Sequence, residues 1–172
     1  MERQNPVLTA IRERRSVRRY TGDPVTREEL LRILEAGRWA PSGLNNQPWR
    51  FLVIQAGDAR QEALASCSKY APILRSASAL ICVFLDREAM YHEAKDHQSA
   101  GACIQNMLLA AHALDLGGVW LGEIINHSPQ VMDALSLDSR LLELQAVIAL
   151  GRPAHPGVSS RKELAELLLE EL

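Results

Sequence analysis

The chain has few cysteines for its length. Cys67, Cys82 and Cys103 are the only three in 172 residues, with no CxxC spacing and no nearby histidine pair. An odd number of thiols without a secretory leader argues against a disulfide framework. We therefore expect buried thiols in a protein of a reducing compartment.

Long apolar runs and a strong charge of one sign are also missing. No run reaches the roughly 18 residues that a membrane span requires, and the opening MERQNPVLTA lacks the apolar core of a signal peptide. The formal net charge of −2 disfavours a general affinity for nucleic acid or anionic membranes. The sequence thus predicts a cytoplasmic protein that binds neither membranes nor nucleic acid.

The motifs of several enzyme classes are absent as well. There is no GxGxxG after a strand, no Walker sequence, no GxSxG and no HExxH, and the five histidines lack metal-ligand spacing. Asp96 and His97 open a long helical segment, where an acidic side chain favours capping. No nucleophile–base pair emerges, so we expect neither a catalytic side chain nor a metal site. An enzyme with so few catalytic groups of its own usually takes its reactivity from a cofactor.

The order of predicted elements indicates a single α+β domain over residues 1–172, with a sheet of four to five strands wrapped by helices. Apolar runs predict buried strands at residues 51–54, 79–85, 119–121 and 144–150. Helices are predicted after Asn5-Pro6, after a Thr26/Glu29 capping box, over 58–67, over 96–114 and after Ser128-Pro129. The alanine- and leucine-rich 96–114 helix is typical of a buried central helix, and Gly117-Gly118 is expected to end it.

Residues 152–172 are predicted to form an arm and a terminal helix. Ser160 and Glu163 make a capping-box pattern, and Leu164, Leu167 and Leu168 follow at helical spacing. A detached amphipathic helix has to bury its apolar stripe, and a partner subunit offers one place for it.

The first candidate for a binding site is the basic run from Arg14 to Arg19. Guanidinium groups match phosphate oxygens as rigid forks of donors, and the Ser16 hydroxyl adds a contact. In an extended segment, Arg14, Ser16 and Arg18 would face one side and converge on a ligand. A solvated basic edge or an RNA-contacting patch explains such a run equally well.

Three further segments are candidates. Residues 41–49 (PSGLNNQPW) combine turn formers with hydrogen-bonding amides, and residues 117–122 (GGVWLG) end at Gly122, whose bare backbone N–H suits a planar heterocycle. Gly151 and Arg152 precede Arg161, which is predicted in the first turn of the terminal helix, where a cation is unfavourable unless an anion is also bound. Each segment also has a purely structural explanation. Residues 41–49 could be a connector, Gly117-Gly118 a helix C-cap, and Arg161 an ordinary surface arginine.

In this order the motifs resemble those of the nitroreductase family of flavoenzymes. The likeness rests on RRSVR at residues 14–18 and APSGLNNQPW at residues 40–49, and it continues through Gln105-Asn106, the 117–122 segment and LGRP at residues 150–153. It covers nearly the whole chain. The chain is shorter than many relatives, and its brief 86–96 segment leaves open what covers the cofactor. At position 43 this chain has glycine where members of the family often have another small residue, and we expect this difference to have little effect on the site.

The resemblance implies a mixed, mainly antiparallel sheet in an intertwined homodimer with two FMN sites at the subunit interface. On one chain, Arg14, Arg15 and Ser16 would bind the phosphate and ribityl end, and Arg18 would lie near the N1/O2 edge of the ring. The residues implied from the partner subunit are Pro41, Ser42, Gly43, Asn45 and Gln47. Leu121 and Gly122 would lie by N5, and Arg161 with Gly151 and Arg152 would close the phosphate site.

The implied activity is that of an FMN-dependent oxidoreductase with a ping-pong mechanism. NAD(P)H would reduce a tightly bound FMN and leave, after which a small conjugated acceptor, such as a nitroaromatic or quinone, would take two electrons. The chemistry would be that of the flavin, tuned by Arg18 and Gly122. The alternatives are flavin or iron reduction, dehalogenation or flavin cleavage on the same scaffold, and a non-catalytic flavin- or RNA-binding module.

Overall fold

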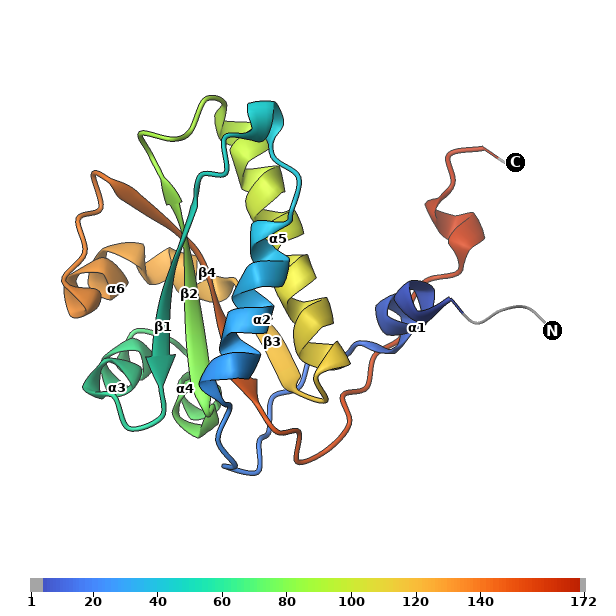
Figure 1. The fold of residues 1–172 in the computed structure, drawn as a ribbon, viewed down its shortest axis with the longest axis horizontal. Helices are drawn as coiled ribbons and strands as arrows, with labels where there is room; N and C mark the ends of the chain where they lie inside the picture. Colours follow the sequence, from blue (N-terminus) through green and yellow to red (C-terminus); the bar gives the residue numbers. More distant parts are fainter. Residues whose placement is uncertain (1–4, 171–172) are drawn as a thin grey trace.

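A computed structural model describes residues 5–170 and contains a central four-stranded sheet (Figure 1). The strands are β1 (Trp49–Gln55), β2 (Ala79–Asp86), β3 (Gly117–Leu121) and β4 (Leu142–Gly151). They pair in the order β1-β2-β4-β3, and every neighbouring pair is antiparallel. One parallel bridge, between Ser16 and Gly118, adds an N-terminal segment to the edge of β3. The predicted α+β class with a mainly antiparallel sheet is confirmed.

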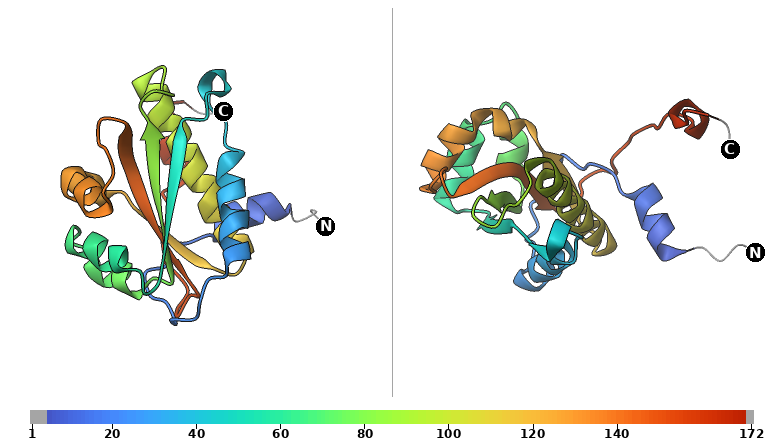
Figure 2. Two further views of the ribbon diagram at one scale, coloured as in Figure 1. Left: turned by 60° about the vertical axis from the view of Figure 1, so that its left-hand side comes forward. Right: turned by 90° about the horizontal axis from the view of Figure 1, so that it is seen from above.

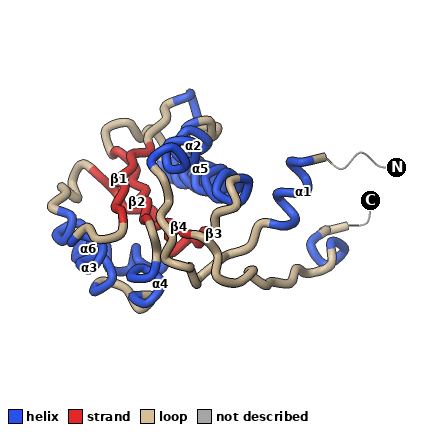
Figure 3. The backbone as a smooth tube through the Cα atoms, turned by 60° about the horizontal axis from the view of Figure 1, so that its bottom comes forward, coloured by secondary structure: helices blue, strands red, loops and turns tan. Residues whose placement is uncertain are grey.

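Helices cover both faces of the sheet (Figures 1 and 3). On one face lie α2 (Arg27–Arg38) and α5 (Glu93–Ala113); on the other lie α3 (Ala59–Ser66), α4 (Ala71–Ser76) and α6 (Ser128–Leu135). In β2, Ile81 and Val83 pack toward α2 and α5, whereas Leu80 and Phe84 face the other layer. The central strands are therefore buried on both faces. None of the helices described in residues 5–170 has the length and apolarity to cross a membrane.

Two helix starts form as their local patterns predict. The Asn5 side chain accepts hydrogen bonds from two backbone N–H groups in the first turn of α1 (Pro6–Glu13). Thr26 and Glu29 make the predicted capping box at the start of α2. These patterns are informative because both partners of each contact lie within three residues of each other.

Several predicted boundaries are wrong. Beyond the end of α5, Asp115 takes the left-handed conformation (φ 57°), and the glycine pair at 117–118 opens β3 instead of ending the helix. Ser128 is the first residue of α6, which continues from a 3-10 turn (Glu123–His127), and its side chain does not cap the helix. β1 is an edge strand with one neighbour, so residues 51–53 are partly exposed rather than buried on both faces. α4 was not predicted.

The cysteines are largely as expected. Cys82 and Cys103 are buried, and Cys67 is half-buried. Burial raises the pKa of the Cys82 and Cys103 thiols to about 12, so both remain protonated and unreactive at neutral pH.

Both chain ends project from the same side of the body (Figures 1 and 2). α1 buries none of its residues, and Val7, Leu8 and Ile11 are about half exposed. The C-terminal segment forms a single 3-10 turn, Leu164–Leu167, whose two leucines are 68% and 62% exposed. The predicted terminal helix with a Ser160 cap is therefore wrong. A helix of that length is marginal without a surface beneath its leucines, and one chain provides no such surface.

Candidate functional site

The arginine-rich segment after α1 lies along the edge of β3. The backbone N–H of Val17 donates to the Gly118 carbonyl oxygen at 3.0 Å. The Val17 side chain is buried, and a Cβ on Gly117 would lie 2.7 Å from the Val17 Cβ, so a glycine is needed where the two segments meet. The Tyr20 hydroxyl lies 2.9 Å from the Val17 carbonyl oxygen and 3.0 Å from that of Ala149. The segment is thereby fixed to the sheet.

The C-terminal arm runs along the same segment. The Ala154 N–H donates to the Arg19 carbonyl oxygen at 3.0 Å. Gly157 approaches so closely that a Cβ there would lie 2.5 Å from the Arg15 Cβ and 2.8 Å from the Ser16 carbonyl oxygen. The absence of a side chain is what permits this contact. No local sequence pattern marks Gly157 as a site residue, because its partner Arg15 lies some 140 positions away.

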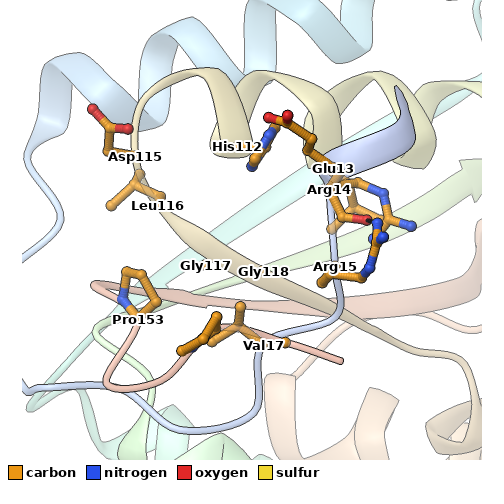
Figure 4. A pocket seen from close by; sticks show the side chains of 13 residues that line it. Glu13, Arg14, Arg15, Val17, His112, Asp115, Leu116, Gly117, Gly118 and Pro153 are labelled. Atoms are coloured by element: carbon orange, nitrogen blue, oxygen red, sulfur yellow. Dashed lines mark hydrogen bonds between the residues drawn. The ribbon is translucent and has the colours of Figure 1, made fainter. Parts of the chain in front are cut away.

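A cavity of about 320 Å³ opens where these segments meet the C-terminal end of α5 (Figure 4). Arg14 and Arg15 line it on the side of α1, and Asp115 and Leu116 line it on the side where α5 leads into β3. Glu13 also lines the cavity, so its wall carries both signs of charge.

Arg14 and Arg15 line this cavity, and the charge of Arg161 acts on Arg14; we call these three residues the arginine cluster. Burial lowers the pKa of Arg14, and the charges of Arg161 and Arg15 lower it further. The Arg14 Nε is buried and has no hydrogen-bond partner within residues 5–170. Like charges around an unsatisfied buried donor are costly unless an anion lies among them. The arginine cluster therefore has the chemistry of a phosphate-binding site.

Arg161 reaches the cluster from an irregular segment. The prediction that it lies in the first turn of a helix is wrong, because the short turn begins three residues later, at Leu164. Its guanidinium donates to the Ser159 hydroxyl at 3.0 Å and to the Ser160 carbonyl oxygen at 2.7 Å. The path of the arm, rather than a helix end, directs this side chain.

Gly151 and Arg152 serve the packing of the sheet end. Arg152 donates to Glu29 Oε1 at 2.7 Å and so ties the end of β4 to the start of α2. A Cβ on Gly151 would lie 2.8 Å from the Tyr20 ring. The structure does not place Arg152 with the arginine cluster.

Ser16 and Arg18 line a neighbouring hollow of about 350 Å³, together with residues of the arm. Arg14 lines the first cavity and not this hollow. The predicted convergence of Arg14, Ser16 and Arg18 on one point is therefore not seen in a single chain. The Arg18 side chain is exposed and available to a ligand that extends from one cavity to the other.

At the end of β3, Leu121 is buried and Gly122 has no side chain, whereas Trp120 is exposed. The Leu121 side chain is buried in the core layer beneath α3 and α6. Gly122 has φ −80° and ψ −23°, a conformation open to any residue, and a Cβ there would lie 3.3 Å from the Trp120 indole nitrogen. Trp120 itself is 42% exposed.

The amide loop, residues 40–48, has an unusual backbone. Leu44, Asn45 and Gln47 all have positive φ angles, of 54°, 55° and 47°. The Ser42 hydroxyl accepts a hydrogen bond from the Gln47 backbone N–H at 3.1 Å, and the Gln47 side chain donates to the Asn45 carbonyl oxygen at 3.0 Å. Ser42 and Gln47 thus shape the loop, while Pro41, Leu44 and Asn45 are exposed on it.

Asn46 ties the amide loop to α5. Its Nδ2 donates to Asp96 Oδ1 at 2.7 Å and to the Ala89 carbonyl oxygen at 3.0 Å. Asp96 is fully buried, and its Oδ2 accepts from the backbone N–H groups of Tyr91 and His92 at 2.9 and 2.8 Å. Asp96 therefore accepts from the N-cap residue of α5, which begins at Glu93 rather than at Asp96, while His97 pairs with Glu143 at 2.7 Å instead of capping the helix. Asp96 also holds the loop, which the sequence did not reveal.

Gly43 packs against the Tyr91 side chain. A Cβ at this position would lie 1.8 Å from the hydroxyl oxygen of Tyr91. A larger residue here would displace that side chain, and the expectation that glycine at this position changes little stays a prediction.

One chain does not bring the amide loop and the arginine cluster together. Asn46 contacts the first turn of α5 through Asp96, whereas the cavity beside Arg14 lies at the last turn, near His112 (Figure 1). α5 has 21 residues, which corresponds to about 30 Å at 1.5 Å per residue. A ligand that uses both segments would take them from two chains.

The fold and the arginine cluster together define an α+β protein built to hold a phosphate-bearing ligand. The chain matches the model of the nitroreductase family over residues 11–72 and 59–152, and it belongs to that family. A putative NADH dehydrogenase/NAD(P)H nitroreductase of Methanothermobacter thermautotrophicus is 32% identical over 154 residues, 88% of this chain and 80% of that protein.

Two solved structures share the fold. A putative nitroreductase from Desulfovibrio desulfuricans, crystallised in complex with FMN, is 62% identical with a TM-score of 0.98, and the match covers 99% of each chain. An NADPH:FMN oxidoreductase from Vibrio harveyi, complexed with NAD+, is 25% identical with a TM-score of 0.87, over 98% of this chain and 78% of that one.

The Asn46–Asp96 contact predicts a pH-dependent loss of stability in Asp96→Asn. Burial opposes the charge of Asp96, but hydrogen bonds from His92, Asn46 and Tyr91 outweigh it and lower its pKa below the ordinary 3.8. A lowered folded-state pKa contributes stability above the unfolded-state pKa, and that stability is lost as the pH falls through the folded-state value. Urea unfolding at pH 7 should show a loss of about 1–3 kcal/mol.

The difference between wild type and Asp96→Asn should shrink as the pH falls below 3.8. Asp133→Asn, on the exposed side of α6, is the matched control and should change stability by less than about 0.5 kcal/mol. An equal loss from Asp96→Asn at every pH would show that the charge of Asp96 is not what holds the loop.

Proposed function

We propose that this protein is an FMN-dependent oxidoreductase that takes electrons from NAD(P)H and passes them to a small conjugated acceptor, such as a nitroaromatic or quinone. The single observation that carries the proposal is the arginine cluster, with its unsatisfied Arg14 Nε, in a member of the nitroreductase family. A relative that is 62% identical over nearly its whole length binds FMN.

The residues present fit FMN. The arginine cluster supplies guanidinium donors for the phosphate, and Gly157 lets the arm close over the segment that carries them. Ser16 and Arg18 line the adjoining hollow, where the ribityl chain and the pyrimidine edge of the ring would follow. Bound FMN supplies the two-electron chemistry, with hydride accepted from NAD(P)H and electrons released to the acceptor.

The chain's own residues would bind FMN, orient it and polarise its ring. Arg18 would place a cation where negative charge develops at the pyrimidine edge of the ring, which favours the transfer. The backbone N–H of Gly122, a half-buried residue directly after β3, would donate to the ring of the flavin. In the proposed ping-pong order, donor and acceptor use the same face of the site in turn.

We infer that the working unit is a homodimer with each site shared between subunits. Arg14 and the amide loop lie at opposite ends of α5 in one chain, and the projecting ends expose Val7, Leu8 and Leu164. Apolar surface of this kind marks an interface. Residues 152–172 would pack on the partner subunit, and Pro41, Ser42, Gly43 and Asn45 would meet the flavin bound by the partner.

The proposal predicts a yellow protein. The purified chain, loaded with FMN, should show flavin absorbance that bleaches under anaerobic NADH or NADPH and returns on adding a quinone or nitroaromatic. Double-reciprocal plots at several acceptor concentrations should be parallel, as a ping-pong order requires. A protein that takes up no flavin, or whose flavin neither nicotinamide bleaches, would contradict the proposal.

Replacing Arg14 should weaken recognition of the phosphate specifically. Arg14→Ala should lower the affinity for FMN by about 10- to 100-fold, the loss typical of a charge-assisted hydrogen bond, and should leave riboflavin binding within about twofold. Arg12→Ala, in the exposed last turn of α1, is the matched control and should change neither. Fluorescence titration with both flavins measures the difference. Equal losses for FMN and riboflavin would place the phosphate elsewhere.

Mixed dimers test whether the site is shared. Asn45→Gly keeps the positive φ of the loop while removing its exposed amide, and both Asn45→Gly and Arg14→Ala homodimers should bind FMN weakly. A heterodimer of the two variants, purified with two different tags, would carry one intact site and one doubly altered site. About half of its sites should then titrate with wild-type affinity. If both segments served the same site from one chain, no site of wild-type affinity would appear.

A further inference from the structure

The segment between β2 and α5 is short but firmly held against the amide loop. Asp96 Oδ2 accepts the backbone N–H groups of Tyr91 and His92, and the Ala89 carbonyl oxygen accepts from Asn46 of the loop. Three hydrogen bonds thus join the 89–92 segment to α5 and to the loop.

The Tyr91 ring lies against the one loop residue without a side chain. Its hydroxyl oxygen occupies space 1.8 Å from where a Cβ on Gly43 would be, and its Cζ atom lies 2.5 Å from the same point. Lys95 Nζ lies 5.5 Å from the ring centroid, within the range of a cation–π contact. Even so, the residue is 41% exposed. An aromatic ring thus lies beside the amide loop, and part of its surface is exposed.

We propose that Tyr91 is the specificity-determining residue of the acceptor site and restricts acceptors to those with a single ring. This inference rests on the proposed function, in which Ser42 and Gly43 meet the flavin of the partner subunit. A planar molecule lying on that flavin beside Gly43 has the Tyr91 ring at its edge. One aromatic ring fits in front of this wall, whereas a second fused ring meets it.

The position of the ring follows from the two contacts. Gly43 leaves room for the phenol, and the Asp96 hydrogen bond fixes the backbone that carries it. The backbone of the wall is thereby held in place, and size discrimination by a side chain at the edge of a site amounts to about tenfold or more per added group. The brief 86–96 segment achieves with one side chain what a longer insertion would achieve with an added helix.

The test compares one- and two-ring ligands on the FMN-loaded dimer. The dissociation constants of benzoate and 2-naphthoate are measured from the perturbed absorbance of the oxidised flavin, and kcat/KM is measured for 1,4-benzoquinone and 1,4-naphthoquinone with NADH. Tyr91→Ala should raise the preference for the two-ring ligand by about tenfold in both measurements. Tyr91→Phe, which keeps the ring, should shift it by less than about twofold.

Gly43→Ala provides a second route to the same result. Its Cβ would displace the Tyr91 ring, so the variant should also shift the preference toward two rings, but not when Tyr91→Ala is already present. Additive shifts from the two substitutions would overturn the inference. So would an unchanged preference in a Tyr91→Ala dimer that still holds its flavin. A wild-type protein that binds no flavin would instead contradict the proposed function itself.

Discussion

The grouping of Arg14, Arg15 and Arg161 is the interaction on which the rest of the structure depends. The charges of Arg15 and Arg161 disfavour the charge of Arg14, and the buried Arg14 Nε has no hydrogen-bond partner in residues 5–170, although Glu13 and Asp115 line the same cavity. An anion held among these guanidinium groups would supply that partner. The surrounding architecture serves this grouping: β3 anchors the arginine segment through Gly118, and Gly157 brings the arm close enough for Arg161 to join. The close contacts of Gly117 with Val17 and of Gly157 with Arg15 thus position the segments that carry the three arginines.

The second constraint is the length of α5. Because the amide loop is fixed at one end of this helix and the arginine cluster at the other, a single chain separates the two by most of its length. The exposed leucines of α1 and of the 164–167 turn point to the same conclusion from hydrophobicity. A second copy of the chain would account for both features. One association would bury the apolar side chains of α1 and of the 164–167 turn, and it would bring the amide loop of one chain to the arginine cluster of the other. Binding of the ligand and dimerisation would then stabilise each other.

Sequence patterns predicted what depends on near neighbours. The Thr26/Glu29 box, the Asn5 cap and all four strands are confirmed, because each is specified by residues a few positions apart. The predictions that failed depend on distant partners. The terminal helix needed a surface beneath Leu164 and Leu167 that one chain does not provide. Asn45-Asn46 gave no indication of which amide turns inward, since the answer lies with Asp96, fifty positions away. The placing of Arg14 and Arg161 together could be expected only from the family resemblance, because the arm that joins them has no periodic pattern.

Asp96 belongs both to a local pattern, at the start of α5, and to a contact between distant parts of the sequence. It lies in the first turn of the most buried helix, and its two oxygens accept from the loop on one side and from the 89–92 segment on the other. A loop with three positive φ angles would otherwise sample many conformations, and a binding surface needs its groups held by a rigid element. By fixing the loop to α5, Asp96 makes the loop a rigid extension of the same helix whose other end carries the arginine cavity. If two chains share a site, the position of one chain's loop relative to the other chain's arginines would then depend on the packing of helices, which deforms little.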